Sequence, residues 1–374
     1  PFTRRFKKKK SAMIAKTRLQ ISRTALEHNF RFLKTAAGPK AKLMGVVKAN
    51  GYGTDLVKLS QWLVELGADA LCVAYTPEGV ALRRAGITVP VLVLHPQVED
   101  LENAIAEDLS LSVYSISFLE TLVAMGAEQK IDVHLNLNTG LNRLGIKPHE
   151  VEKAVQLIEA HPQIELSHLM THLIGSEDPA LKEVTEDQLN TFEESVAFIE
   201  QALGKTLKKH ALNSSGALNY PEATFDMIRC GIALHGFAND SVLDQKLKPI
   251  STLFSQISAL RTIEKGESVS YNRQFIADAP MTIATIPVGH ADGFTRDLGN
   301  GRGQVLIKGQ HVPVVGMVCM DLFMIDVTGL EVAVGDEVVL IGQELTANKL
   351  AEQSGTIPYE LLTGIGPRIP RLFI

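Results

Sequence analysis

The feature that most constrains the fold is a regular alternation of short apolar runs with amphipathic segments. The amphipathic segments, such as residues 24–36 and 191–203, carry apolar residues three and four positions apart, which predicts helices. The apolar runs have the length of buried strands. Eight such runs occur, at residues 42–47, 70–74, 89–95, 109–113, 131–137, 164–170, 209–213 and 226–234.

Eight strand–helix units predict an α/β fold in which an N-terminal (β/α)8 TIM-type barrel has its active site at the carboxyl ends of the strands. The rival fold is an open doubly wound sheet, but no G-x-G-x-x-G follows the first run. After residue 245 the runs become β-rich and are divided by Gly, Asp and Asn, which predicts a mostly β domain, helical near its end. We therefore expect a basic tail or linker over 1–15, a cofactor-binding barrel over 16–245 and a C-terminal β domain over 246–374.

Charge and hydropathy narrow the classes of partner. The chain has 374 residues, 45% of them hydrophobic, and a formal net charge of −5, so we expect a small-molecule partner or a second copy rather than nucleic acid. The basic run RRFKKKK at 4–10 is interpreted as a solvated tail or linker. No run of 18 apolar residues is present, so we expect no membrane-spanning segment.

Cysteine usage points to a reducing compartment. Cys72, Cys230 and Cys319 are too few and too scattered for a disulfide framework or a zinc site. Carboxylates and histidines do not cluster at the predicted strand ends, so no metal is expected either. A cytoplasmic location is the resulting expectation.

The stretch VVKANGYG at 46–53 places a charged side chain where a buried strand ends. In a barrel this position, Lys48, lies at the catalytic mouth. An amine there is partly desolvated and can act as a base or form a Schiff base. The alternative is a lysine that simply extends into solvent.

Polar groups at other strand ends favour the catalytic interpretation. Hydroxyls, N–H groups and small residues after the seventh and eighth runs are what a phosphate site in a barrel requires. Tyr52, four residues beyond Lys48, would add a phenolic donor. An amine, a phosphate cradle and an arginine together describe pyridoxal 5′-phosphate better than a sugar phosphate or a metal. The residues concerned are His172, Asn213, Ser214, Arg229, Gly231 and Ile232.

From about residue 17 to its end, the chain resembles the alanine racemases, which are fold type III pyridoxal phosphate enzymes. The resemblance rests on ordered motifs, because single blocks of this length would be weak indicators. The motifs are VVKANGYG, NTGLNRLG (138–145), MTHL, LNSS, RCGIALHG, VSYNRQF (269–275), VCMDLFMIDVT (318–328) and PYELLTGIGPRIPR (358–371).

The resemblance implies a role for each matching residue. Lys48 would bind the cofactor, with Tyr52 and Ser214 at its phosphate and Arg229 facing its pyridine nitrogen. Tyr271 would be the second catalytic base. The remaining implied residues are His172, Asn213, Gly231, Ile232 and Tyr359 around the cofactor, and Arg143 and Met320 at the substrate.

Racemisation explains these residue types, because an α-proton must leave one face of the substrate and another must arrive on the opposite face. By resemblance, Lys48 serves the D-enantiomer and Tyr271 the L-enantiomer. A phenol acts as a base only beside cationic or hydrogen-bonded neighbours, which His172 and Arg229 would supply. The family also implies a homodimer in which Tyr271 completes the site of the other subunit, and a role in supplying D-alanine for peptidoglycan.

Four residues depart from the family pattern, and all affect the substrate corridor. Asn136 replaces the usual carbamylated lysine that orients the arginine, and Asn138 replaces an aspartate. His290 replaces a tyrosine, and Met317 stands where an arginine is common. A broad-spectrum or serine racemase therefore stays open as the alternative.

Two other classes share this fold type. Non-catalytic pyridoxal phosphate-binding proteins lack the C-terminal β domain that is expected here. Decarboxylases place a partner's cysteine opposite the lysine and a glutamate at the pyridine nitrogen, and Arg229 argues against them. Cys319 is interpreted as a small residue beside the substrate pocket.

Overall fold

A computed structural model describes residues 15–238 and 240–374. The basic run at 4–10 lies outside the described residues. The chain forms two compact units, named here the barrel unit, Ser22–Ile250, and the β unit, Ser251–Ile374 with the described residues up to Ile21. Among the described residues, no helix combines the length and apolar character needed to cross a membrane.

The barrel unit contains the expected parallel eight-stranded sheet, in the order β8-β7-β6-β5-β4-β3-β2-β9. Beyond the paired strands, Asp226 N donates to Lys209 O at 3.0 Å and Arg229 N to Leu212 O at 3.0 Å, so the two end strands lie together and the barrel is nearly closed. Each apolar run contains one strand. The strands are β2 (Lys42–Val46), β3 (Ala70–Val73), β4 (Val91–Val93), β5 (Ser110–Val113), β6 (Ile131–Asn136), β7 (Ile164–Met170), β8 (Lys208–His210) and β9 (Met227–Cys230).

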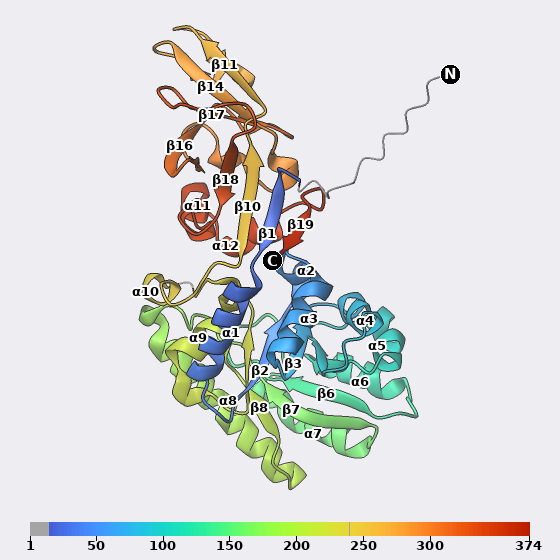
Figure 1. Ribbon diagram of the computed structural model, residues 1–374. Helices are drawn as coiled ribbons and strands as arrows, with labels where there is room; N and C mark the ends of the chain where they lie inside the picture. The colour runs from blue at the N-terminus through green and yellow to red at the C-terminus, as the bar shows by residue number, and fades with distance from the viewer. Residues whose placement is uncertain (1–14, 239) are drawn as a thin grey trace, which may run out of the picture. The chain divides into compact units, whose positions relative to one another are not determined.

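Helices surround these strands (Figure 1). In α8 the buried Phe192, Val196 and Ile199 recur at four and three positions, as an amphipathic helix requires. Each such side chain contributes about 1.5–3 kcal/mol by leaving water. The helices of this unit include α1 (Arg23–Ala36), α2 (Lys48–Tyr52), α3 (Leu56–Leu66), α4 (Thr76–Arg84), α5 (Leu101–Ala106), α6 (Ile116–Ala124), α7 (Val151–Ala160), α8 (Lys182–Leu203), α9 (Ser214–Asn219) and α10 (Ser241–Asp244).

The β unit is built on a nine-stranded sheet in the order β11-β14-β17-β16-β15-β18-β10-β1-β19. Strands β12 (Ser268–Val269) and β13 (Phe275–Ile276) form a separate hairpin, and residues 270–274 connect them. Helices α11 (Ala347–Ser354) and α12 (Pro358–Thr363) lie near the end of the chain. The sheet strands are β1 (Arg18–Ile21), β10 (Ser251–Gln256), β11 (Ala259–Ile263), β14 (Met281–Ile286), β15 (Gln304–Ile307), β16 (Gln310–Val315), β17 (Phe323–Asp326), β18 (Glu337–Ile341) and β19 (Arg371–Phe373).

The first strand belongs to the β unit, whereas the sequence placed residues 16–245 in the barrel. Strand β1 pairs antiparallel with β10 and parallel with β19, and lies between them in Figure 1. Its buried Leu19 and Ile21 alternate with more exposed residues, as in a sheet with one covered face. The barrel unit accordingly begins at Ser22 and extends to Ile250 rather than 245.

Candidate active site

Lys48 lies two residues beyond the end of β2 and is half-buried, at the carboxyl end of the barrel strands. The next four residues have left-handed backbone conformation, with φ of 54° at Ala49, 54° at Asn50, 61° at Gly51 and 53° at Tyr52. L-residues in this conformation each cost about 1–2 kcal/mol. A run of them therefore persists only because neighbouring groups fix it, and such fixed strain is typical of functional sites.

Three hydrogen bonds fix this turn from outside its backbone. Glu78 is central, because its other carboxylate oxygen accepts from Ala74 N at 2.9 Å and so ties the turn to the end of β3. The bonds run from Ala49 N to Glu78 Oε1 at 2.7 Å, from Leu56 N to Asn50 Oδ1 at 3.1 Å and from Thr54 Oγ1 to Gly51 O at 2.6 Å.

Ser214 and the start of the segment after β9 form a polar cradle. Ser214 Oγ accepts from Gly231 N at 3.1 Å and from Ala233 N at 3.3 Å. A Cβ added at Gly231 would lie 2.2 Å from the Tyr52 hydroxyl, so glycine is required for this close approach. Clustered N–H groups and hydroxyls of this kind suit a phosphate.

Asn213 positions Ser214 by capping α9. Its side-chain oxygen accepts from Gly216 N at 2.8 Å and from Ser176 Oγ at 2.9 Å. Ile232, which follows Gly231, is buried at the start of the short helix η5 (Ile232–His235). The structure therefore brings together the predicted residues Tyr52, Ser214 and Gly231, with Asn213 and Ile232 adjacent to them in the chain.

Arg229, in β9, is only 4% exposed, and its two terminal nitrogens donate hydrogen bonds to five acceptors. Burial lowers its pKa to about 10, which leaves the guanidinium charged at neutral pH. Because a guanidinium has no acceptor, each histidine nitrogen facing it must be the acceptor. The acceptors are His210 Nδ1 (2.7 Å), His210 O (2.9 Å), Thr171 O (2.7 Å), Ala211 O (3.1 Å) and His172 Nδ1 (3.3 Å).

His172 is electrostatically coupled to the predicted cations of the barrel unit. Burial, followed by the charges of Arg229, Arg143 and Lys48, lowers its pKa to about 3. A neutral ring that accepts at Nδ1 carries its proton on Nε2. His172 can therefore donate a hydrogen bond through Nε2.

Arg143 is exposed, on a loop that Asn138 organises. The Asn138 side-chain oxygen accepts from Gly140 N at 3.1 Å and from Asn142 N at 3.1 Å, an Asx turn that an aspartate would also make. Asn138 therefore keeps the loop geometry despite departing from the family pattern. Asn136 is 8% exposed at the end of β6 and carries no charge that could orient Arg143.

Tyr271 lies at the tip of the β12–β13 hairpin and is 67% exposed. The flanking Ser270, Asn272 and Arg273 have φ of 70°, 56° and 51°, which is unusual outside glycine. Ser270 Oγ donates to Met317 O at 2.8 Å, and Val269 anchors the hairpin in a small apolar cluster. The hairpin therefore fixes the backbone around a tyrosine whose side chain is open to solvent.

Met320, 60% exposed, lies beside a loop that contains His290. His290 N donates to Cys319 O at 3.0 Å and Ala291 N to Met320 O at 3.0 Å. Ser270 Oγ lies 3.6 Å from Cys319 Sγ, so the segments that carry Tyr271 and Met320 are neighbours.

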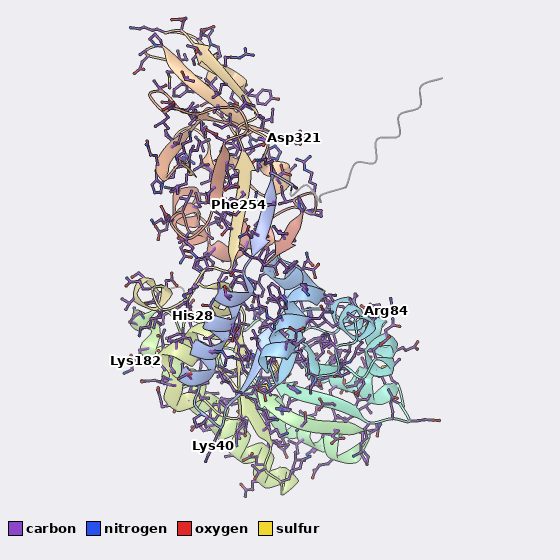
Figure 2. The ribbon with its side chains drawn as sticks, viewed as in Figure 1. His28, Lys40, Arg84, Lys182, Phe254 and Asp321 are labelled. Carbon is purple, nitrogen blue, oxygen red and sulfur yellow. The ribbon has the colours of Figure 1, made fainter. Side chains whose placement is uncertain are left out.

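Two hydrogen bonds from Arg368 to the Asp292 carboxylate join the loop that contains His290 to the C-terminal part of the chain. Arg368 donates to Asp292 at 2.7 and 3.0 Å and to Asp321, labelled in Figure 2, at 2.6 Å. A Cβ at Gly293 would meet Gly364 O at 2.4 Å, just beyond α12, which carries the half-buried Tyr359. Tyr271, Met320 and Tyr359 are thus all positioned by the β unit.

Sequence reasoning missed four polar residues of the barrel unit. Glu78 fixes the turn after Lys48, and three histidines lie behind Arg229 inside the barrel. A histidine in the middle of each of three predicted buried strands was the available signal. The three are His134, His168 and His210.

The arrangement in the barrel unit can bind an anion, present an amine and offer a fixed cation. No group of three or more His, Cys, Asp or Glu side chains within residues 15–238 and 240–374 is arranged to bind a metal ion. Cys72 and Cys230 are buried free thiols whose pKa burial raises to about 12, so they are poor nucleophiles.

Comparisons with known proteins cover almost the whole chain. The family described as alanine racemase, N-terminal domain, matches residues 21–239, and the alanine racemase, C-terminal domain, matches residues 250–373. The chain is 37% identical to the alanine racemase of Sorangium cellulosum, over 96% of this chain and 98% of that protein. It is 38% identical to the alanine racemase of Symbiobacterium thermophilum, over 95% and 96%.

Solved structures agree with these sequence matches. Alanine racemase from Streptomyces lavendulae superposes with a TM-score of 0.91 at 28% identity, covering 97% of this chain and 98% of that one. Alanine racemase from Bacillus anthracis with bound L-Ala-P gives 0.90 at 32% identity, covering 97% and 96%.

Proposed function

This chain belongs to the alanine racemase family and is an amino-acid racemase, and from that premise we propose that it interconverts L- and D-alanine with pyridoxal 5′-phosphate. The observation that carries the proposal is the buried Arg229, fixed by donor-only hydrogen bonds in the same barrel as the strained turn after Lys48. This pairing of a fixed cation with an amine suits the chemistry of the cofactor.

The residues present fit each polar group of the cofactor. Lys48 would offer an amine to the aldehyde and the Ser214 cradle donors to the phosphate. Arg229, whose terminal nitrogens donate to five protein acceptors, would offer its Nε–H to the pyridine nitrogen. We assign Tyr52, His172, Asn213, Gly231, Ile232 and Tyr359 to the surrounding contacts. When bound, pyridoxal 5′-phosphate withdraws electrons from the substrate Cα and acidifies its α-proton.

Arg229 sets the polarity of that site. A guanidinium cannot take up a proton, and at a pKa of about 10 Arg229 does not give one up at neutral pH. A pyridine nitrogen held beside Arg229 would therefore stay unprotonated and would accept a hydrogen bond from it. Arg229 would thus limit how strongly the cofactor withdraws electrons, which would disfavour side reactions.

Lys48 and Tyr271 would be the two bases. One accepts the α-proton from one face of the substrate and the other donates a proton to the opposite face, so no electrons are gained or lost. His172 supports the tyrosine, because its Nε2–H can donate to a phenolate oxygen. Arg143 and Met320 would contact the substrate.

We propose a homodimer in which Tyr271 of the partner subunit completes each barrel site. The exposure of Tyr271 and Met320, at 67% and 60%, is the supporting observation, because it leaves both side chains accessible to a second chain. Each site would then need both chains.

The expected role is supply of D-alanine for peptidoglycan, as the family implies. Buried free thiols at Cys72 and Cys230 support the proposal of a reducing, cytoplasmic environment.

Racemisation of a panel of L-amino acids by the cofactor-loaded protein tests the substrate. Chiral chromatography should show turnover of L-alanine well above that of serine, lysine and arginine. Comparable turnover of those amino acids would replace alanine racemase by a broad-spectrum racemase, for which the uncharged Asn136 and Met317 are the motivating residues. A protein that binds the cofactor and turns over nothing would contradict both.

Mixing two inactive variants tests the shared site. In a heterodimer of Lys48→Ala and Tyr271→Phe chains, one site would combine both changes and the other neither. Random exchange should then restore about a quarter of the wild-type activity. No recovery, with heterodimers shown by mass spectrometry, would place both bases in one chain.

A further inference from the structure

Behind Arg229, the barrel interior contains three histidines that the proposed mechanism does not use. His210 and His134 are 0% and 3% exposed, and His168 is half-buried. They come from the adjacent strands β8, β6 and β7, and His134 and His168 lie opposite each other in register. We name them the histidine cluster.

The hydrogen bonds that join Arg229, His210 and His134 have a single possible direction. Arg229 can only donate, so His210 accepts at Nδ1 over 2.7 Å. A neutral His210 then carries its proton on Nε2, which lies 2.9 Å from His134 Nδ1. His134 must accept there, so its own proton is on Nε2. Burial and the Arg229 charge lower the pKa of His210 and keep its ring neutral.

The surroundings hold His134 in place. Its ring stacks on His168 with centroids 4.1 Å apart and planes at 24°. Its Nε2 lies 3.9 Å from Asp132 Oδ2, a carboxylate that also accepts from the Ser110 hydroxyl. His168 Nδ1 in turn lies 2.8 Å from Ser167 Oγ.

The cluster is not arranged as a metal site. Stacked rings direct their in-plane lone pairs along separate lines, so His134 and His168 cannot converge on one ion. The described residues contain no group that could hold a metal. Fixing the proton on His210 is the function that the geometry supports.

We propose that His134 is a positioning residue for Arg229. By accepting from His210 Nε2, it holds His210 in the tautomer whose Nδ1 lone pair faces the guanidinium. Without that acceptor, the buried Nε2–H of His210 has no partner, and only the hydrogen bond from Arg229 still favours this tautomer over the one protonated at Nδ1. The consequence for catalysis rests on the proposed function, whereas the tautomer itself does not.

Two replacements of His134 of similar size separate the loss of its hydrogen-bond acceptor from the loss of the imidazole ring. His134→Leu removes the acceptor, whereas His134→Asn can place an amide oxygen near the position of Nδ1. We would measure ring ¹⁵N spectra of histidine-labelled holoenzyme, with the His210 signals assigned from a His210→Gln variant. Wild type and His134→Asn should show His210 protonated at Nε2 alone, and His134→Leu should show loss of that single tautomer.

Racemisation kinetics give the second readout. The kcat of His134→Leu should fall about tenfold with KM nearly unchanged, and His134→Asn should recover most of it. An unchanged His210 tautomer in His134→Leu would overturn the inference. A wild-type His210 that is protonated at Nδ1 or charged would overturn it even if the leucine variant failed to fold. If the tautomers behave as expected but no amino acid is racemised, only the proposed function fails.

Discussion

The barrel unit and the β unit position their candidate residues in opposite ways. Arg229 is 4% exposed and its terminal nitrogens donate to five acceptors, whereas Tyr271 is 67% exposed at the tip of a hairpin. Buried polar groups require partners within the same fold. Exposed groups are free of that requirement and are available to a second surface.

The two units nevertheless share one device, a strained backbone that is fixed by neighbours. Residues 49–52 follow Lys48 in left-handed conformation, and Ser270, Asn272 and Arg273 flank Tyr271 with positive φ. A hydrogen bond from Ala49 N to the Glu78 carboxylate supports the first strained segment, and one from Ser270 Oγ to Met317 O supports the second. A strained backbone therefore adjoins both proposed bases, Lys48 and Tyr271. The two side chains differ in how far they are buried.

Replacing the barrel base should have the largest effect. Lys48→Ala removes the only amine proposed to react with the cofactor, so kcat should fall by at least about 10⁴-fold and the covalent cofactor absorbance should disappear. Lys40→Ala, at an exposed lysine labelled in Figure 2, is the matched control and should retain both. Residual turnover within tenfold of wild type would remove Lys48 from the mechanism.

Replacing the exposed base should separate activity from stability. Tyr271→Phe should reduce kcat by about 10²–10⁴-fold, the usual contribution of a positioned acid or base. Its free energy of unfolding should change by less than about 0.5 kcal/mol, because the hydroxyl lies on an exposed side chain. Steady-state kinetics and urea unfolding measure the two quantities, with Tyr75→Phe, 50% exposed in the barrel unit, as control. Full activity in Tyr271→Phe would contradict the assignment of Tyr271 as the second base.

The contrast in burial predicts a contrast in stability. Arg229→Met leaves the buried carbonyls of Thr171 and Ala211 without the donor that Arg229 supplies, and should cost about 3 kcal/mol in the free energy of unfolding. Met320→Ala in the β unit should change it by less than about 0.5 kcal/mol. If urea titrations gave equal losses of unfolding free energy for the two variants, the contrast between the barrel unit and the β unit would be wrong.

The smallest effect concerns acid stability and His235, a buried ring stacked on Tyr52 with centroids 4.9 Å apart. Neither ring nitrogen has a hydrogen-bond partner, and burial lowers the pKa of His235 to about 3. The unfolded chain takes up this proton below about pH 6.5, whereas the folded chain does so only near pH 3. Stability therefore falls as the pH drops through that window, by about 2 kcal/mol at pH 5.

His235→Phe should remove this dependence and leave stability at pH 7 unchanged or slightly higher. Thermal unfolding of the variant between pH 7 and pH 4 measures the slope against wild type. His149→Phe, at an exposed histidine, controls for loss of an imidazole and should keep the wild-type slope. Equal slopes for wild type and His235→Phe would show that folding does not lower the pKa of His235.

Much of the barrel was predictable, because strand and helix periodicity are local properties of the chain. Each of the eight apolar runs contains a barrel strand, and Lys48 lies at the end of the first one, as expected. Strand β1 was not predictable, because its four residues fit either unit until they pair with β10. The roles assigned to the site residues stay predictions.

The sequence by itself determined the order of strands and helices, the family and the set of candidate residues, because these depend on residue type and spacing. Only the tertiary structure decided which polar groups face each other. His134 and His210 are 76 positions apart and meet only when β6, β7 and β8 pair in one sheet. Exposure is decided in the same way, since Arg229 is buried by barrel closure and Tyr271 is exposed by the hairpin that carries it.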